Sequence, residues 1–306
     1  MIYTVTLNPA IDYVVCLNGP VAPGTINRSA GEDYQFGGKG INVSNVLRNL
    51  GQDTVALGFT AGETGAWLER GLSRMGLDTR FIRLDRGMTR INVKVKGLEE
   101  TEINGMGPEI GPEDLEKLAV LLEELKTGDV LVLSGSVPGC LGPDTYEKLL
   151  ARLAGRDVLT VVDAAGELLT RTLKYCPFLV KPNDKELADI FHRPMATEAD
   201  LAEAARELQA MGARNVLVSL AGDGALLMDE RGGVHRMACP QGKVINSVGA
   251  GDSMVAGFLT GWLNTGDYDM ALRWGIAAGS ATAFSLGLAD REAVEELLGR
   301  MSEKRS

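Results

Sequence analysis

The apolar residues of the chain follow two patterns that alternate along its length. Short apolar or β-branched runs bounded by turn residues, such as residues 2–7, 54–59 and 129–133, predict strands. Apolar residues spaced three and four positions apart, as in residues 43–50 and 115–125, predict helices with one buried face. Because strands and helices alternate, we predict an α/β fold with a mainly parallel, doubly wound sheet flanked by helices.

Further elements of the same two kinds complete the predicted order. Strands are expected at residues 81–84, 101–104, 158–162, 178–180, 215–220 and 225–228, and helices at residues 65–75, 145–154 and 199–211. No internal repeat, low-complexity segment or long linker interrupts this order. We therefore expect a single domain over residues 1–306.

One segment differs from the buried strands in its pattern. Residues 89–95 alternate apolar and polar side chains, as an antiparallel strand with one open face does. In an extended strand Arg90, Asn92 and Lys94 share a face, which is cationic and rich in hydrogen-bond donors. A solvated strand surface would show the same pattern, so an anion site and simple exposure are both compatible with it.

Polar residues and glycines occur repeatedly where predicted strands end. In open α/β sheets ligands bind beyond the carboxyl ends of the strands, which lie along one edge. The residues placed there by the pattern are Asp12, Ser136, Asp163, Asn183, Glu186, Gly222, Gly224 and Asp252. Each could be a solvated turn residue by itself, but their shared location predicts a binding site at that edge.

Residues 246–258 contain a glycine-rich turn followed by a helical pattern. The turn is Gly249-Ala250-Gly251, and free N–H groups at the helix start would attract an anion such as phosphate. Asp252 could cap this helix, or it could take a proton from a hydroxyl that attacks the phosphate. The turn lacks the third glycine of a dinucleotide-binding fingerprint and the Lys-Ser/Thr of a Walker loop.

A second glycine-rich loop precedes a helix at residues 37–42. Its glycines, including Gly38, let the backbone close around a ligand. Lys39 can neutralise a phosphate, and Asn42 can hydrogen-bond a sugar hydroxyl. The alternative is a flexible loop with an exposed lysine, but a turn alone does not need this combination of residues.

Composition narrows the class of partner. The net charge of −10 argues against nucleic acid or an anionic membrane as a partner, although a local cationic cluster could still bind a phosphorylated substrate. The four Cys show no Cys-x-x-Cys pair and there are only two His, so a zinc site is not expected and the Cys are interpreted as reduced. The N-terminus reads as a strand rather than a signal peptide, and we expect a cytoplasmic protein without membrane spans.

The two glycine-rich loops resemble the two signatures of the PfkB (ribokinase-like) carbohydrate kinase family, and Asn183-x-x-Glu186 between them matches a third motif of that family. The resemblance covers essentially the whole chain. Residues 6–12, 37–43, 89–94 and 181–183 are most similar to the branch that phosphorylates ketohexose phosphates. Asn246-Ser247 departs from the Asp-Thr of many members, which leaves activation by K⁺ open.

The resemblance implies a ribokinase-like fold with a small β-sheet lid, built here from segments 13–36 and 88–104. In relatives such lids pair to form a homodimer, so a homodimer through the lid is expected. The implied reaction is ATP- and Mg²⁺-dependent phosphorylation of the C6 hydroxyl of fructose 1-phosphate. Kinases of the same family acting on tagatose 6-phosphate or fructose 6-phosphate are the alternatives.

The resemblance also implies roles for individual residues. Asp252 would be the catalytic base, with Gly249, Ala250 and Gly251 holding the transferring phosphoryl group. Sugar hydroxyls and the substrate phosphate would be bound by Asp12, Arg28, Gly38, Lys39, Asn42, Arg90, Asn92 and Ser136. The nucleotide would contact Lys181, Asn183, Ser219, Gly222 and Gly224, and Glu186 with Asn183 would place Mg²⁺.

Two other classes of function are possible alternatives to a kinase. A non-catalytic sensor of sugar phosphates or nucleotides could keep the pocket without turnover, but a pure binder has no use for a base beside an anion site. An oxidoreductase is disfavoured because the third glycine of the dinucleotide fingerprint is missing, with Met254 in its place.

Overall fold

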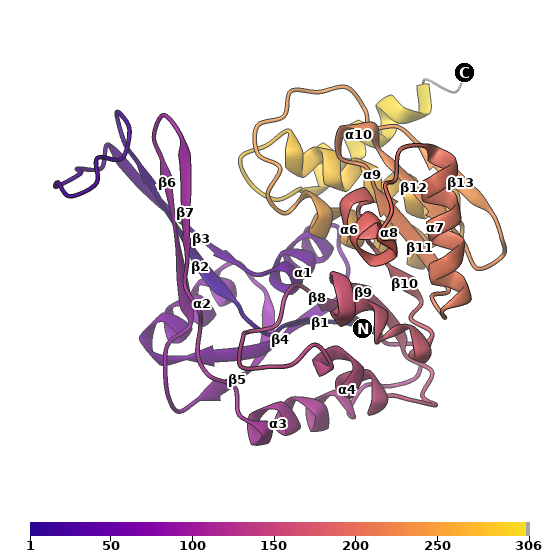
Figure 1. Cartoon of the computed structure of the whole chain (residues 1–306), viewed down its shortest axis with the longest axis horizontal. Helices are drawn as coiled ribbons and strands as arrows, with labels where there is room; N and C mark the ends of the chain where they lie inside the picture. The colour runs from indigo at the N-terminus through magenta and orange to yellow at the C-terminus, as the bar shows by residue number, and fades with distance from the viewer. Residues whose placement is uncertain (304–306) are drawn as a thin grey trace.

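The large sheet is the framework of the molecule, whose computed structural model describes residues 1–303 (Figure 1). Its strand order is β13-β12-β11-β10-β9-β8-β1-β4-β5, parallel from β5 to β11, with β12 and β13 antiparallel at one edge. The strands are β1 Ile2–Thr6, β4 Thr54–Ala61, β5 Asp78–Leu84, β8 Val130–Ser134, β9 Leu159–Asp163, β10 Leu179–Val180, β11 Asn215–Ser219, β12 Ala225–Met228 and β13 Val234–Met237. The prediction of a mainly parallel α/β sheet is confirmed.

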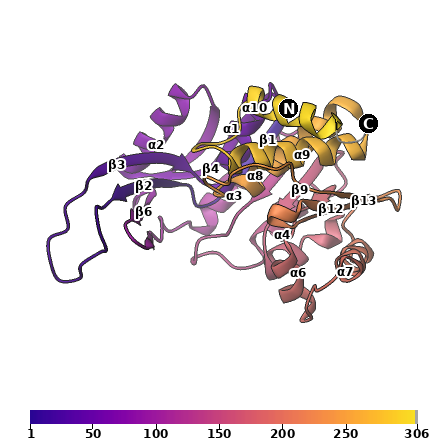
Figure 2. The same cartoon turned by 90° about the horizontal axis from the view of Figure 1, so that it is seen from above.

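Helices cover both faces of this sheet, as the view from above shows (Figure 2). On one face lie α1 Lys39–Asn49, α8 Ala250–Thr265, α9 Tyr268–Ala283 and α10 Arg291–Glu303. On the other lie α3 Pro112–Leu122, α4 Thr145–Ala151, α5 Gly166–Thr170, α6 Asp184–Phe191 and α7 Glu198–Ala210. Two separate apolar cores therefore sandwich the strands, as the continuous apolar runs of the buried strands require.

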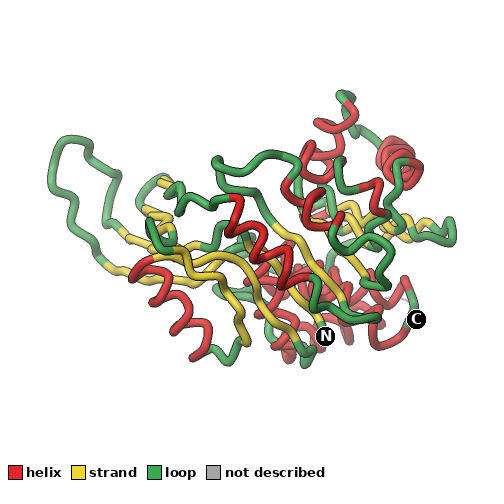
Figure 3. Tube along the Cα trace, turned by 90° about the horizontal axis from the view of Figure 1, so that it is seen from below, coloured by secondary structure: helices red, strands yellow, loops and turns green. Residues whose placement is uncertain are grey.

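A second sheet of four strands projects from the large one (Figures 1 and 2). Its order is β3-β2-β6-β7, formed by β2 Ala10–Cys16, β3 Gly31–Gly37, β6 Arg90–Lys96 and β7 Glu100–Asn104. Helix α2 Gly62–Arg74 packs against it through Leu68 and Leu72, which join a third core with Ile11. The loop of residues 17–30 extends beyond the far end of this small sheet (Figure 3).

The pairing of the small sheet differs in part from the expectation. Strand β6 pairs antiparallel with β7 but parallel with β2, so the alternating pattern of residues 89–95 did not by itself fix the pairing direction. In this register Asp12 lies opposite Asn92. Asp12 therefore belongs to strand β2 of the small sheet, and not to the turn after β1 where the sequence pattern placed it.

Helices α5 and α6 and strand β13 were absent from the predicted order. They comprise residues 166–170, 184–191 and 234–237, and β13 lies at the edge of the sheet. Helix α6 is short, and the residues of its capping box, Asn183 and Glu186, had been interpreted only as a chemical motif. Strand β13 consists of polar and half-exposed positions, so it carries no clear apolar signal. Within residues 1–303, no helix combines the length and apolar composition needed to cross a bilayer.

Close packing of α8 against α9 fixes the start of α8. A Cβ atom on Gly257 would lie 2.3 Å from the carbonyl oxygen of Trp274, so only glycine allows the two helices to approach this closely. On the sheet side, Val255, Phe258 and Leu259 of α8 are fully buried. The N-terminus of α8 is consequently held at the carboxyl edge of the parallel strands.

Candidate active site

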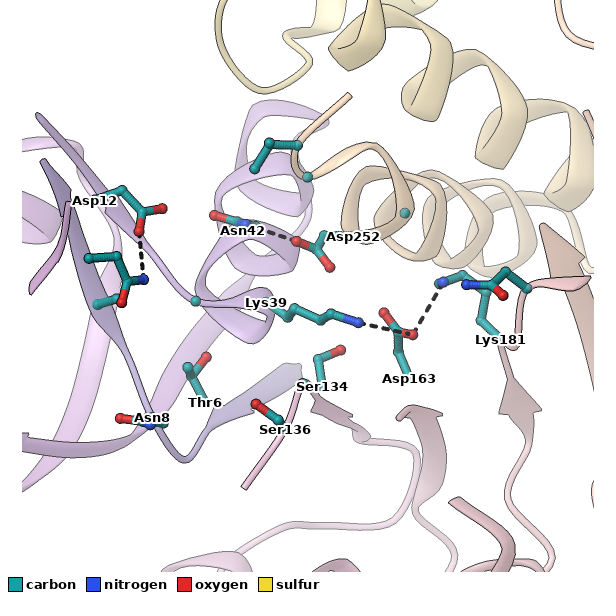
Figure 4. Close-up of a pocket in the computed structure, with 18 of the residues that line it drawn as sticks. Thr6, Asn8, Asp12, Lys39, Asn42, Ser134, Ser136, Asp163, Lys181 and Asp252 are labelled. Atoms are coloured by element: carbon teal, nitrogen blue, oxygen red, sulfur yellow. Dashed lines mark hydrogen bonds and ion pairs between the residues drawn. The ribbon is translucent and has the colours of Figure 1, made fainter. Parts of the chain in front are cut away.

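A cavity of about 460 Å³ lies where the carboxyl ends of the parallel strands face the starts of α1 and α8 and one side of the small sheet (Figure 4). Most of the residues that the sequence singled out lie on its wall. They are Asp12, Gly38, Lys39, Asn42, Arg90, Asn92, Ser136, Lys181, Asn183, Glu186, Ser219, Gly249, Gly251 and Asp252. Segments from all parts of the chain thus meet at one place.

Helix α8 begins at the cavity with free N–H groups. Gly249 adopts φ 80°, a left-handed conformation that favours glycine, and starts the helix without a side-chain cap. In the described part of the chain, the N–H groups of Gly249, Gly251 and Asp252 have no acceptor, whereas Ala250 donates to the carbonyl of Ser247. Three N–H groups are therefore available to an anion, and Ala250 does not line the cavity.

The carboxylate of Asp252 is buried at 5% exposure and does not cap α8, so that alternative is wrong. It instead accepts a hydrogen bond of 2.8 Å from Nδ2 of Asn42, which comes from α1. Burial and the nearby charge of Asp163 raise the pKa of Asp252 to about 6, while Asn42 and two lysines oppose this rise. A carboxylate tuned in this way is suited to act as a base near neutral pH.

Two lysines converge on Asp163 below Asp252 (Figure 4). Oδ1 of Asp163 lies 3.2 Å from Nζ of Lys181 and 3.8 Å from Nζ of Lys39. Burial lowers the pKa of Lys181, but the surrounding carboxylates, Asp163 first, outweigh burial and raise it, so the ammonium stays charged. The sequence predicted Lys39 at the phosphate already on the substrate, and its half-exposed ammonium lies beside Asp163 in this structure.

Asp163 is the main residue of this site to which the sequence assigned no role. Its position at the end of a strand was recognisable, and the structure adds that its side chain is 2% exposed with two cations beside it. The two cations, Lys39 and Lys181, come from α1 and from the segment after β10, so no local sequence pattern could have identified them as partners of Asp163. Thr6, Asn8, Ala10, Ser134, Gly135 and Val248 also line the cavity without having been predicted.

The small sheet contributes the other wall of the cavity. Nδ2 of Asn92 donates to Oδ1 of Asp12 at 2.8 Å, across the parallel pair β2–β6. Arg90 is half-buried, and this burial lowers its pKa against the opposing charge of Asp12. Arg90 therefore supplies a cation on the same wall as a hydrogen-bonded carboxylate and amide, a combination suited to a phosphorylated polyol.

Several buried polar atoms around the cavity lack a partner within the described residues. A buried polar atom without a hydrogen-bond partner destabilises the folded protein unless a ligand or a water molecule forms that hydrogen bond. Those on cavity residues are Oδ1 of Asn8, Nε of Arg90, Oδ1 of Asn92, Oγ of Ser134 and Oδ2 of Asp163. Their concentration here indicates a polar ligand.

Asn183 and Glu186 form a reciprocal capping box at the start of α6. Oδ1 of Asn183 accepts from the Glu186 N–H at 2.8 Å, and Oε2 of Glu186 accepts from the Asn183 N–H at 2.9 Å. The described residues contain no cluster of three or more His, Cys, Asp or Glu that could hold a metal. The free Oε1 of Glu186 fits a Mg²⁺ ion bound mainly by phosphates and water, and does not fit a site made only of protein ligands.

Besides Ala250, three predicted residues lie away from the main cavity. Gly222 lines a neighbouring cavity of about 530 Å³ beside α6 and α7. Gly224 has φ 96°, and a Cβ atom there would lie 2.0 Å from the Met237 carbonyl oxygen. The backbone conformation and this close contact therefore require glycine at position 224. Arg28 is exposed in the loop beyond the small sheet.

Comparison with known proteins adds independent findings. Residues 5–293 match the model of the pfkB family carbohydrate kinases. The chain is 43% identical to 1-phosphofructokinase of Bacillus subtilis strain 168, over 97% of both chains, and 38% identical to D-tagatose-1-phosphate kinase of Bacillus licheniformis, over 95% of both. Its fold is similar to that of phosphofructokinase-2 from Escherichia coli in complex with fructose 6-phosphate (TM-score 0.90, 29% identity, 98% of this chain and 99% of that chain covered).

Proposed function

Because the chain belongs to the pfkB family of carbohydrate kinases, we propose that it phosphorylates the C6 hydroxyl of D-fructose 1-phosphate with ATP. The products would be fructose 1,6-bisphosphate and ADP. The observation that carries the proposal is the position of Asp252, whose buried carboxylate lies in the first turn of α8 beside free N–H groups. A base and an anion site thereby share one helical turn.

The reaction would need little covalent chemistry from the protein. Phosphoryl transfer depends mainly on in-line placement and on stabilising the charge of the transferring group. Asp252 would take the proton of the attacking hydroxyl, since a pKa of about 6 leaves it mostly ionised at neutral pH and still basic. The N–H groups of Gly249 and Gly251, with that of Asp252, would donate to the oxygens of the phosphoryl group.

The sugar phosphate would lie between the small sheet and α8. Asp12, held by Asn92, would accept sugar hydroxyls, and Arg90 would bind the phosphate already present. Gly38, Ser136 and Asn42 would border the sugar. Lys39 and Arg28 were also assigned to that phosphate, and they would reach it only after movement of the lysine or of the loop that carries Arg28.

The nucleotide would occupy the end of the cavity formed by the large sheet. Lys181, Asn183 and Ser219 line this end, and Gly222 and Gly224 belong to the adjoining loop. Mg²⁺, when bound, would neutralise charge on the ATP phosphates. Glu186 would hold it through its free oxygen, with Asn183 beside it, while both residues continue to cap α6.

A second substrate has one specific observation in its favour. A relative of 38% identity is named D-tagatose-1-phosphate kinase, and tagatose 1-phosphate differs from fructose 1-phosphate only in the configuration at C4. A non-catalytic sensor has less support, because burying Asp252 beside an anion site is costly and brings no benefit to a protein that only binds.

We further propose a homodimer formed through the small sheet. Large apolar side chains on its strands and loops are exposed, including Ile26 at 83%, Leu98 at 80% and Ile103 at 63%. Every residue of the edge strand β7 is exposed, and open sheet edges are usually covered in stable proteins. A second copy of this sheet would provide such cover.

The proposed function is tested by coupled ADP release with MgATP and five acceptors in parallel: fructose 1-phosphate, tagatose 1-phosphate, tagatose 6-phosphate, fructose 6-phosphate and free fructose. We expect the highest kcat/KM for fructose 1-phosphate. Repeating the assay in K⁺ and in Na⁺ salts tests activation by potassium. Binding of MgATP without product from any acceptor would contradict the kinase proposal and favour a sensor.

A further inference from the structure

The free N–H groups at the start of α8 belong to a backbone turn that is not rigid by itself. Gly249 adopts φ 80° there, and glycine changes between backbone conformations more readily than other residues. The carbonyl oxygen of Gly249 accepts the first hydrogen bond of α8, from the N–H of Ser253. A rotation of the peptide between Gly249 and Ala250 would break that bond and redirect the neighbouring N–H groups. The proposed anion site therefore depends on what holds this peptide.

Ser253 holds the peptide from the side of the helix. Its N–H and its hydroxyl both donate to the carbonyl oxygen of Gly249, each at 2.9 Å. Ser253 is fully buried, so water does not compete for its hydroxyl. At the other end of the same peptide, the N–H of Ala250 donates to the carbonyl of Ser247 at 3.2 Å. Both polar groups of the peptide are therefore fixed.

A second buried hydroxyl, from α9, fixes the direction of the first. Thr282 lies in the last turn of α9 at 1% exposure, and its Oγ1 lies 2.7 Å from Oγ of Ser253. A hydroxyl carries one proton. Because Ser253 uses its proton for the Gly249 carbonyl, Thr282 donates the bond between the two hydroxyls. Thr282 itself accepts from the N–H of Ala289 at 2.8 Å, which gives one chain of donors that ends at Gly249.

The far end of this chain is attached to well-packed helices. Ala289 is 1% exposed, and its carbonyl oxygen accepts from Nδ2 of Asn49, the last residue of α1, at 2.9 Å. The same helix carries Asn42, which holds the carboxylate of Asp252. Hydrogen bonds connected in series polarise one another and strengthen the whole chain. The chain thus ties the turn that carries the base and the anion site to both α1 and α9.

We propose that Ser253 and Thr282 are positioning residues for phosphoryl transfer, whose hydroxyl pair keeps the α8 turn in the conformation that directs its N–H groups at the transferring group. The inference rests on the proposed kinase function but not on the identity of the sugar. Within the described structure neither hydroxyl lines the cavity, so both act through the Gly249 peptide rather than by touching a substrate.

The alternative role of this pair is simply to stabilise the packing of α8 against α9. Thr260 separates the two roles, because it lies in α8 and is fully buried. Among the described residues its hydroxyl donates only to the carbonyl of Ala256 in its own helix, at 2.9 Å. Replacing Thr260 or Thr282 by valine removes one buried hydroxyl and keeps the shape of the side chain. A purely structural pair predicts a loss of thermal stability in both variants and no loss of kcat in either.

The test measures kcat and KM of Thr282→Val, Thr282→Ser and Thr260→Val with MgATP and the preferred sugar phosphate, at a temperature at which circular dichroism shows all three to be folded. We expect kcat of Thr282→Val to fall about 10²-fold with little change in KM, as for a reacting group displaced by about 1 Å. Thr282→Ser keeps the hydroxyl and should restore kcat, and Thr260→Val should match the parent protein. An unchanged kcat in Thr282→Val, or equal losses in the two valine variants, would overturn the proposal.

A double variant tests whether the two hydroxyls act as one chain. Ser253→Ala removes the donor to Gly249 directly, so adding Thr282→Val should cause little further loss of kcat, as for residues coupled through one contact. Losses that multiply would show that the hydroxyls act separately and would contradict the chain. If Thr282→Val does not fold, Ser253→Ala is compared with Thr260→Val in its place, with the same expected loss of kcat.

Failure of the proposed function is recognised in the wild type, before any variant is made. If the wild type forms no product from any sugar phosphate, the kinase proposal fails and the positioning role fails with it. If the wild type turns over and Thr282→Val does so equally well, only the positioning role is wrong.

Discussion

At the scale of single residues, the charge state of Asp252 connects stability with chemistry. Its folded-state pKa of about 6 lies above its ordinary value of 3.8, because burial disfavours the ionised form. Ionisation of this residue therefore destabilises the folded protein at pH values above about 6, and that penalty disappears as the pH falls below 3.8. The proposed base is kept at the expense of stability.

Replacement of Asp252 by Asn should thus have opposite effects on activity and stability. We expect kcat to fall by orders of magnitude with little change in KM, because a transition-state interaction is lost. Removing the buried charge should stabilise the protein at pH 8 by up to about 3 kcal/mol, and the gain should vanish near pH 4. Steady-state kinetics and denaturant unfolding at both pH values measure the two effects; an unchanged kcat would exclude Asp252 as the base.

Asn42 offers a second prediction, on pH dependence. Its hydrogen bond lowers the pKa of Asp252, so Asn42→Ala should raise that pKa above the value of about 6 in the parent protein. Because only ionised Asp252 accepts a proton, kcat/KM should rise with pH through this pKa. The rising limb should move to higher pH in the variant. A profile of kcat/KM from pH 5 to 9 checks this, and a limb that stays in place would mean that Asn42 acts only on the sugar.

At the scale of elements, the start of α6 combines a structural and a proposed chemical role. Asn183 and Glu186 each use one side-chain oxygen for the capping box, which leaves Oε1 of Glu186 free for a cation. The Asn-x-x-Glu spacing serves both purposes, since residues three apart at a helix start can reach each other's N–H groups. The motif alone could not show which purpose it serves.

Two substitutions in this box should separate the purposes. Glu186→Gln keeps an oxygen that can accept the Asn183 N–H, so the unfolding midpoint should be preserved while the Mg²⁺ concentration needed for half-maximal rate increases. Asn183→Ala removes a cap acceptor and should cost about 1 kcal/mol of stability. Thermal unfolding and Mg²⁺ titrations of the rate measure both variants. An unchanged Mg²⁺ dependence in Glu186→Gln would restrict Glu186 to the cap.

At the scale of the whole molecule, the cavity exists because two sheets meet over one edge. Asn42 and Asp252 are 210 positions apart in the sequence, yet they share a hydrogen bond of 2.8 Å. Asp12 and Asn92 of the small sheet form one wall of the cavity, and the starts of α1 and α8, which pack on the large sheet, form the wall facing it. Motion of the small sheet relative to the large one would therefore open or close the site.

The proposed dimer gives a prediction at this scale. Ile103→Asp places a charge on the exposed edge strand β7 and should dissociate a dimer that forms through the small sheet, because burying an unpaired carboxylate is unfavourable. Val120→Asp, on the exposed side of α3, is the matched control and should leave the oligomer intact. Light scattering after size exclusion measures the mass. A mass unaffected by Ile103→Asp would argue against this interface.

The sequence alone determined the class of fold and most of the candidate wall residues. Apolar runs and helical spacings define elements because they depend on neighbours within a few positions, and strand ends of a parallel sheet necessarily share one edge. Glycine-rich turns before α1 and α8 were recognisable for the same local reason. Strand β13 was missed because it carries little apolar signal, and α6 was missed because it is only eight residues long and its first turn was interpreted as a chemical motif.

Only the tertiary structure decided which chemical partners meet. The sequence allowed Asp252 to be a helix cap or a base. Its carboxylate accepts a hydrogen bond from Asn42 rather than from the N–H groups of its own helix, because α1 and α8 pack closely together. Asp163 was one strand-end acid among several until Lys39 and Lys181 were seen beside it. Such contacts join residues far apart in the chain, and they raise or lower pKa values through burial and charge. Both are properties of the packed molecule and not of any local stretch of sequence.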